Sequence, residues 1–237
     1  MSIWGKIGGA AAGMLVGGPI GAAVGVLAGH FLIDRDAAAG GGDPGIAFTI
    51  AMIALSAKMA KADGVVTDEE IEAFDRIFRL PQDERTSVRR FFDLAQQDTA
   101  GYEAYAGQIA RLYAGKPALL EDILDGLFEI AKADGVLHPG EDAFLERVAE
   151  IFGFAPGEYR RIRASHFAPD AADPYVVLGV SYDASDDEIK RTYRLLVREN
   201  HPDRLIARGV PEEFVLLATD KLAAINGAYE KILAERR

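Results

Sequence analysis

A proline-broken turn between two amphipathic segments constrains the fold of this chain most strongly. The turn, residues 200–204, reads Asn-His-Pro-Asp-Arg. A capping box at residues 185–188 begins the helix before the turn. Pro202 ends that helix, because proline lacks a backbone donor and disfavours α geometry at His201. Pro211 begins a second long amphipathic helix, so the sequence predicts two antiparallel helices with an exposed turn between them.

The helix that enters the turn has one basic face. Its four cations are spaced so that they project from the same side: Lys190, Arg191, Arg194 and Arg198. Side chains three or four residues apart share a helix face. This pattern favours a surface that binds an acidic partner. The alternative is an ordinary solvated face beside an ordinary turn between helices.

Further signatures surround this turn in a fixed order. Residues 173–180 read Asp-Pro-Tyr-Val-Val-Leu-Gly-Val, the basic helix and the His-Pro-Asp turn follow, and residues 228–230 read Ala-Tyr-Glu. Residues 173–237 therefore resemble the J-domain of the DnaJ family, with Arg204 where that family usually has lysine. The resemblance implies a set of residues that dock on a DnaK-type chaperone and stimulate its ATP hydrolysis: His201, Pro202, Asp203, Lys190, Arg191, Arg194 and Arg198.

The amino-terminal segment carries no charged side chain from residue 7 to residue 33. About 20 apolar residues suffice for a helix that spans a bilayer. Glycine recurs at every fourth position, and the repeat comprises Gly5, Gly9, Gly13, Gly17, Gly21, Gly25 and Gly29. Such a row of glycines lets a second helix approach closely. Residues 1–33 are thus predicted to form a glycine-zipper membrane helix that pairs in a homodimer. A soluble glycine-rich hairpin and a signal peptide are the alternatives, and Pro19 weighs against a straight span.

The start of this segment also resembles a known family. Residues 4–7 read Trp-Gly-Lys-Ile, and Gly-His-Phe follows the glycine run at residues 29–31. With the glycine repeat, they resemble the DjlA family of membrane-anchored J-proteins. That resemblance implies a single pass through the bacterial inner membrane, with the J-domain in the cytoplasm beside a DnaK-type chaperone.

The middle of the chain contains an internal repeat. The sequence Ala-Lys-Ala-Asp-Gly-Val occurs at residues 60–65 and again at residues 131–136. A glutamate follows each aspartate by seven positions, which gives the pairs Asp63 with Glu70 and Asp134 with Glu141. Carboxylates at this spacing could bind a divalent cation across a helix-loop-helix junction. In the alternative interpretation, the glutamates cap helix starts and the aspartates lie in turns.

The repeat places this region in a helical domain. Residues 45–166 resemble the TerB-like all-α bundle, in which two Asp-Gly hairpins pack together. The acidic hairpin residues of related domains have been suggested to bind metal, so the resemblance adds support for a cation site but does not decide between the two interpretations. Residues 34–44 are predicted to be a glycine-rich linker. Residues 167–172 are predicted to be a short hinge that leads to the J-domain at 173–237.

Composition and motifs exclude several functions. The chain has 237 residues, no cysteine and a formal net charge of -11, which argues against disulfides, thiol catalysis and nucleic-acid binding. It has no phosphate-binding loop and no metalloprotease motif, so we expect neither an enzyme nor a resident organic cofactor. The prediction is an all-α, membrane-anchored co-chaperone. The alternative is a metal-responsive protein of tellurite or envelope stress, with the J-domain as a recruitment tag.

Overall fold

The computed structural model describes residues 44–62, 101–132, 135–167, 173–210, 215 and 217–236. Every regular element in these ranges is a helix, which confirms the all-α prediction. The helices are α3 (Pro44–Ala62), α6 (Tyr102–Leu112), α7 (Pro117–Ala131), α8 (Pro139–Phe152), α9 (Pro156–His166), α10 (Pro174–Leu178), α11 (Asp186–Glu199), α12 (Pro202–Ala207) and α14 (Leu217–Glu235).

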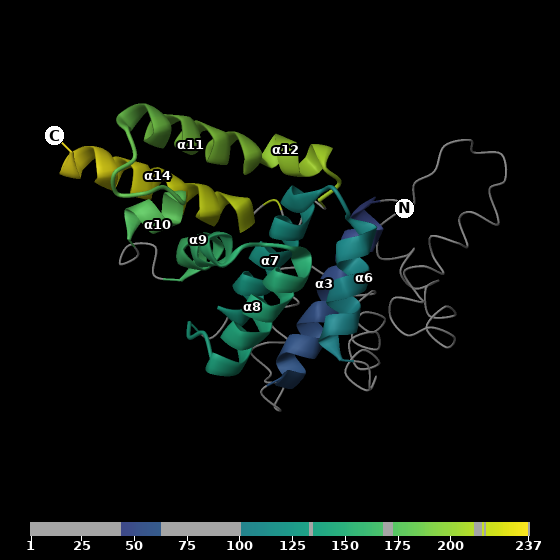
Figure 1. Ribbon diagram of the computed structural model, residues 1–237. Helices are drawn as coiled ribbons and strands as arrows, with labels where there is room; N and C mark the ends of the chain where they lie inside the picture. Colours follow the sequence, from purple (N-terminus) through teal and green to yellow (C-terminus); the bar gives the residue numbers. More distant parts are fainter. Residues whose placement is uncertain are drawn as a thin grey trace, which may run out of the picture.

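Helices α3, α6, α7 and α8 pack together, and α9 packs against α7 and α8 (Figure 1). We call these five helices the helical bundle. Helix α3 carries apolar residues on all sides, as expected for a helix surrounded by protein. Its side chains Phe48, Met52 and Leu55 are fully buried. Its buried hydroxyl at Ser56 donates to the Met52 carbonyl oxygen at 2.7 Å, so burial leaves that group satisfied.

Residues in and beside the turn between α8 and α9 determine how these two helices pack. Gly153 ends α8 in the left-handed conformation, at φ 90°. The Phe154 backbone N–H then donates to the Ala149 carbonyl oxygen at 3.0 Å, which closes the helix end. Tyr159 of α9 donates its hydroxyl to the Asp142 carboxylate at 2.6 Å. These contacts hold α9 against α8 and place its outer face toward the C-terminal helices.

Helices α10, α11, α12 and α14 form a second unit, which we call the C-terminal hairpin. Helices α11 and α14 run side by side, and α10 packs on α14 (Figure 1). Their core includes the buried side chains of Leu178, Ile189 and Ile232. Tyr193 and Tyr229 stack across the two long helices, with ring centroids 4.0 Å apart and planes at 4°. The two antiparallel helices expected from the sequence are therefore present.

The hairpin departs from the sequence prediction just after the turn. Pro202 ends α11, as predicted, but it also occupies the first turn of the short helix α12. Residues 211–214, where the second helix was expected to begin, lie outside the described ranges, and α14 is described from Leu217.

The hairpin and the bundle are packed together. Helix α9 contacts both α10 and α14, and α7 also contacts α14. In Figure 1, α9 lies between the rest of the bundle and the hairpin. Leu205 and Val210 of the hairpin belong to the apolar core of the bundle. The predicted hinge at residues 167–172 therefore joins two units in extensive contact, although residues 168–172 are outside the description.

Candidate functional site

Backbone dihedral angles and local hydrogen bonds keep the His-Pro-Asp turn in an exposed conformation. His201 has φ -69° and ψ 136°, the extended conformation that the following proline favours. Its ring Nδ1 accepts a hydrogen bond from the Asp203 backbone N–H at 3.2 Å, which caps α12. Its carbonyl oxygen accepts from the Arg204 N–H at 2.8 Å. The side chains of His201 and Asp203 remain 54% and 88% exposed, so both are available to a partner.

The basic helix meets the turn in a groove. Helix α11 begins where the Ser185 hydroxyl accepts from the Glu188 backbone N–H at 3.2 Å, as the capping box predicts. All four predicted cations of α11 are exposed. A groove of about 440 Å³ is lined by Tyr193, Arg194, Val197, Arg198, His201, Asp203 and Arg204. The structure thus brings Arg194 and Arg198 together with the turn, whereas Lys190 and Arg191 lie on α11 outside the lining.

The predicted metal ligands are only partly covered by the described residues. Asp63, Glu70 and Asp134 lie outside them. Glu141 is buried at the start of α8, where its Oε2 accepts from the His138 backbone N–H at 2.9 Å. This is the helix-capping role in the alternative interpretation. Within the described ranges, no group of three or more acidic or histidine side chains is arranged to hold a metal ion.

The predicted membrane helix cannot be compared with the structure. Its dimerisation residues Gly9, Gly13, Gly17, Gly21, Gly25 and Gly29 all lie outside the described residues. In the part of the chain that is described, no helix has both the length and the apolar character needed to cross a bilayer.

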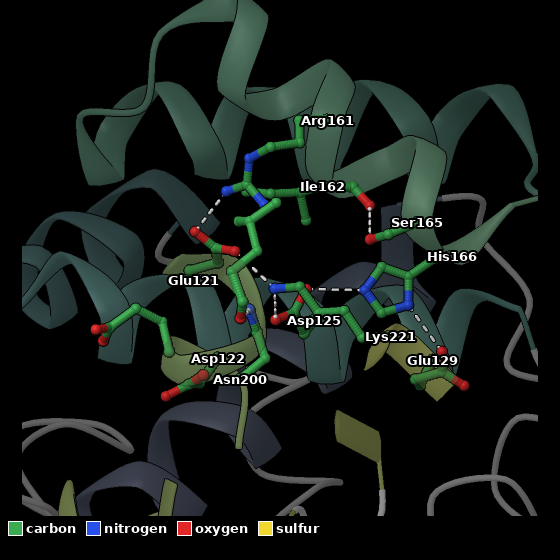
Figure 2. Close-up of polar contacts among 12 residues, drawn as sticks. Glu121, Asp122, Asp125, Glu129, Arg161, Ile162, Ser165, His166, Asn200 and Lys221 are labelled. Atoms are coloured by element: carbon green, nitrogen blue, oxygen red, sulfur yellow. Dashed lines mark hydrogen bonds and ion pairs between the residues drawn. The ribbon is translucent and has the colours of Figure 1, made fainter. Parts of the chain in front are cut away.

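A buried charged cluster joins α7 and α9 of the bundle to α14 of the hairpin (Figure 2). At its centre, the Lys221 ammonium lies 2.6 Å from both Glu121 Oε1 and Asp125 Oδ2. The Lys221 side chain is only 2% exposed. Arg161 of α9 pairs with the other Glu121 oxygen at 2.7 Å. Burial opposes charge on Lys221, but the attraction of Asp125 and Glu121 outweighs it and raises the pKa of the ammonium.

His166 extends this cluster along α7. Its Nε2 lies 2.8 Å from Asp125 Oδ1, and its Nδ1 lies 2.8 Å from Glu129 Oε1. Burial opposes a charged imidazole, but hydrogen bonds to the two carboxylates outweigh it and raise the pKa of His166. An imidazole whose two nitrogens both face carboxylates is best satisfied as the cation, with two N–H donors. No sequence motif indicates this role for His166.

A second contact between the units lies close to the turn. Arg208, just after α12, places its Nη2 3.2 Å from Asp122 Oδ1 of α7. The same nitrogen donates to the Glu199 carbonyl oxygen at 2.9 Å. Burial raises the pKa of Asp122 to about 7, although Arg208 opposes that shift. Asp122 therefore connects the bundle to the end of α11, immediately before the turn.

One sequence signal could have indicated this interface. Glu121, Asp125 and Glu129 recur every fourth residue on a segment that is mostly apolar, and such a stripe requires cationic partners when buried. Their partners Lys221 and His166 lie 96 and 41 residues from Asp125, and nothing in the sequence pairs them.

Three family models match the chain, and together they cover most of it. The DnaJ domain matches residues 173–236, the tellurite resistance protein TerB matches residues 49–164, and the co-chaperone DjlA transmembrane domain matches residues 1–48. The carboxy-terminal match includes the whole turn and α11. The amino-terminal match includes the predicted glycine-zipper segment and indicates a membrane anchor.

Curated relatives match three quarters or more of the chain. The co-chaperone protein DjlA of Photobacterium profundum is 32% identical over 274 residues, which cover 99% of each chain. DjlA of Vibrio cholerae is 33% identical and covers 75% of this chain and 74% of its own. DjlA of Salmonella paratyphi A is 28% identical and covers 100% and 99%. No solved structure gives a significant match. The order of the three family matches and the full-length relatives together show that this chain belongs to the DjlA family of J-domain co-chaperones.

Proposed function

We propose that this protein stimulates the ATPase of a DnaK-type chaperone through the turn at His201, Pro202 and Asp203. The observation that carries the proposal is the exposed turn opening onto the basic groove beside α11. Arg194 and Arg198 would attract an acidic surface of the chaperone and orient it toward the turn. Lys190 and Arg191, farther along α11, would add to that attraction.

Stimulation requires more than binding. A co-chaperone changes the rate of hydrolysis only if it contacts two states of its partner with different strength. The exposed His201 imidazole and Asp203 carboxylate offer directional contacts that one arrangement of the chaperone could satisfy better than another. The ATP chemistry remains in the chaperone, and this chain supplies no catalytic group.

The test is single-turnover ATP hydrolysis by the DnaK-type chaperone of the same organism. The full chain in detergent micelles is added at increasing concentration, with His201→Gln as the variant. We expect stimulation by the wild-type chain and loss of at least 90% of it in the variant, on the order of 1.4 kcal/mol or more. Glu150→Gln, which alters an exposed ion pair on α8, is the matched control and should stimulate normally. Equal stimulation by wild type and His201→Gln would refute the proposal.

We also propose that residues 1–33 cross the inner membrane once, pair in a homodimer and place the hairpin in the cytoplasm. The match of residues 1–48 to a DjlA transmembrane domain supports this placement, and the glycine repeat supports pairing. Retention in membranes after carbonate washing, with the hairpin digested only from the cytoplasmic side, is expected. Gly17→Leu together with Gly21→Leu should weaken crosslinking between copies. Release by carbonate would contradict the anchor.

A further inference from the structure

The segment after the His-Pro-Asp turn is inserted into the helical bundle. Leu205 of α12 and Val210 are each 4% exposed and belong to the bundle core. His201 and Asp203, a few residues earlier, stay exposed. The chain therefore changes from open surface to the interior of another domain within one short helix. Any movement of this segment relative to the bundle would expose apolar side chains, which opposes such movement.

Arg208 connects this segment to both sides of the interface. Its Nη2 lies 3.2 Å from Asp122 Oδ1 in the bundle and donates at 2.9 Å to the Glu199 carbonyl oxygen at the end of α11. Its backbone N–H donates to the Arg204 carbonyl oxygen at 3.0 Å, within the helix that follows the turn. Arg208 thus links α7 to the last residue of α11 through its guanidinium, and its backbone N–H closes the end of α12. The turn at His201 lies between the last two of these.

Within the described ranges, Asp122 contacts the hairpin through only one of its two carboxylate oxygens. Its Oδ1 faces Arg208, whereas its buried Oδ2 has no hydrogen-bond partner among the described residues. A buried carboxylate with a single cationic contact depends on that contact for its charge. Burial raises the pKa of Asp122 to about 7 against the effect of Arg208, which reflects this incomplete compensation. Asp122 has no second described partner to replace Arg208.

A second attachment point between the hairpin and the bundle follows the inserted segment in the sequence. Lys221 near the start of α14 is held by Glu121 and Asp125 at 2.6 Å each (Figure 2). Asp122 and these two carboxylates lie on the same helix, α7. The hairpin is therefore tied to one bundle helix at two places, at Arg208 within the inserted segment and at Lys221 after it. The exposed cations of α11 and the exposed side chains of the turn are not part of these attachments.

We propose that Asp122 is a positioning residue for the turn at residues 201–203, acting across the domain boundary through Arg208. The inference rests on the proposed function of that turn and adds that the TerB-like bundle takes part in it. By holding Arg208 against the Glu199 carbonyl, Asp122 fixes the end of α11 and the start of α12. The chaperone then meets a turn of fixed geometry, which reduces the ordering that binding must supply.

The first test measures stimulation by Asp122→Ala, Arg208→Met and the double variant, with the full chain in detergent micelles. At saturating co-chaperone, we expect each single variant to lower the maximal stimulated rate about fivefold, which is the net size of one typical hydrogen bond. The half-maximal concentration should change less than about twofold, because Arg194 and Arg198 are untouched. The double variant should be no worse than either single variant, because both changes remove the same contact.

Controls separate positioning from damage to the fold. Asp122→Asn keeps the shape and an acceptor oxygen, so it should recover most of the maximal rate lost in Asp122→Ala. Glu150→Ala on α8 removes an exposed carboxylate far from this contact and should have no effect. Partial unfolding would instead raise the half-maximal concentration and leave the maximal rate unchanged, because only the folded fraction of the chain would bind the chaperone.

A second test measures geometry without the chaperone. Because the chain has no cysteine, Glu150→Cys and Asp187→Cys can be spin-labelled specifically on α8 and α11. The distance distribution between labels should be narrow in the otherwise native chain. It should broaden in Asp122→Ala and remain narrow in Asp122→Asn. An unchanged distribution in Asp122→Ala would overturn the positioning role.

The two proposals fail in different ways. Equal ATPase rates for wild type and His201→Gln would refute the function of the turn, and the positioning role with it. Stimulation that depends on His201 but is unchanged by Asp122→Ala would refute the positioning role alone. Additive losses in the double variant would show that Asp122 and Arg208 act separately, which also refutes it.

Discussion

Lys221 of α14 and Asp125 of α7 form a buried ion pair of 2.6 Å between side chains that are 96 residues apart in the sequence. The pair joins the C-terminal hairpin to the helical bundle. Glu121 contacts the same ammonium, so removal of Lys221 would leave two buried carboxylates without their shared cation. Glu121 would keep Arg161 and Asp125 would keep His166, but the buried cluster would lose the cation at its centre, and loss of one member of a buried ionic cluster is strongly destabilising.

Lys221→Met should therefore lower the free energy of unfolding of the full chain by about 3 kcal/mol. Lys190→Met is the matched control, since Lys190 is exposed on α11, and its effect should stay within about 0.5 kcal/mol. Urea denaturation followed by far-ultraviolet circular dichroism measures both. Equal losses in the two variants would show that the buried pair contributes no more than an exposed lysine.

His166 should make stability depend on pH above neutrality. Its pKa in the folded chain is raised above its unfolded value, near 6.5, because the hydrogen bonds to Asp125 and Glu129 outweigh burial. Its contribution is fully present below that unfolded value and is lost as pH rises through the folded pKa. Melting temperatures from pH 6 to pH 9 should fall for the wild-type chain. The fall in melting temperature should be smaller for His166→Gln. If the two chains showed the same dependence of melting temperature on pH, His166 would not be the group that titrates.

Asp122 should make stability depend on pH below neutrality. Burial raises its pKa to about 7, so between about pH 4 and pH 7 the folded state binds a proton that the unfolded state releases. Stability from this group therefore decreases as pH rises through that range, by at most about 1.4 kcal/mol per pH unit. Asp122→Asn should flatten the wild-type profile between pH 5 and pH 7. A profile that Asp122→Asn leaves unchanged would show that this carboxyl does not titrate there.

Gly179 permits a close approach between the hairpin and α9. Its φ is +67°, and a Cβ at this position would lie 2.8 Å from Arg161 Cδ. Gly179→Ala should cost about 1–2 kcal/mol of stability, because it combines backbone strain with displacement of Arg161 from Glu121. Gly157→Ala in α9, where a Cβ would meet nothing within 4 Å, is the matched control. It should be neutral or slightly stabilising, and an equal cost at both positions would refute the close approach.

Arg194 offers a test of electrostatic attraction in the groove. Arg194→Glu should raise the half-maximal concentration for ATPase stimulation about tenfold at low salt, and by less at high salt. Arg147→Glu on α8 changes the net charge equally but lies outside the groove, so it should have little effect. Equal shifts in the two variants would indicate a general charge effect instead of a local binding surface.

Local patterns predicted the helices and the turn well. The capping box at Ser185, the apolar spacing of α11 and the position of Pro202 depend on neighbouring residues, and the structure confirms them. Family resemblance extended this to the domain types, which the family matches confirm. The roles of the predicted site residues at the turn and on α11 remain predictions, although the structure brings several of them together.

The contact between domains could not be predicted in the same way. Lys221 lies in an amphipathic helix where a lysine normally faces solvent, and only packing against α7 reveals its burial. Arg208 and Asp122 are likewise joined by tertiary structure alone, 86 residues apart. Sequence periodicity describes one helix at a time, so it cannot show which helix supplies the opposing charge.

The burial of Leu205 and Val210 in the bundle core bears on how the chain folds and how it can be divided. A fragment cut at the hinge would expose both side chains to water and leave Lys221 without its carboxylates. The bundle and the hairpin should consequently unfold in a single cooperative step, although sequence matching treats them as separate modules. Proteases that cleave the connection should release two weakened halves instead of two independent domains.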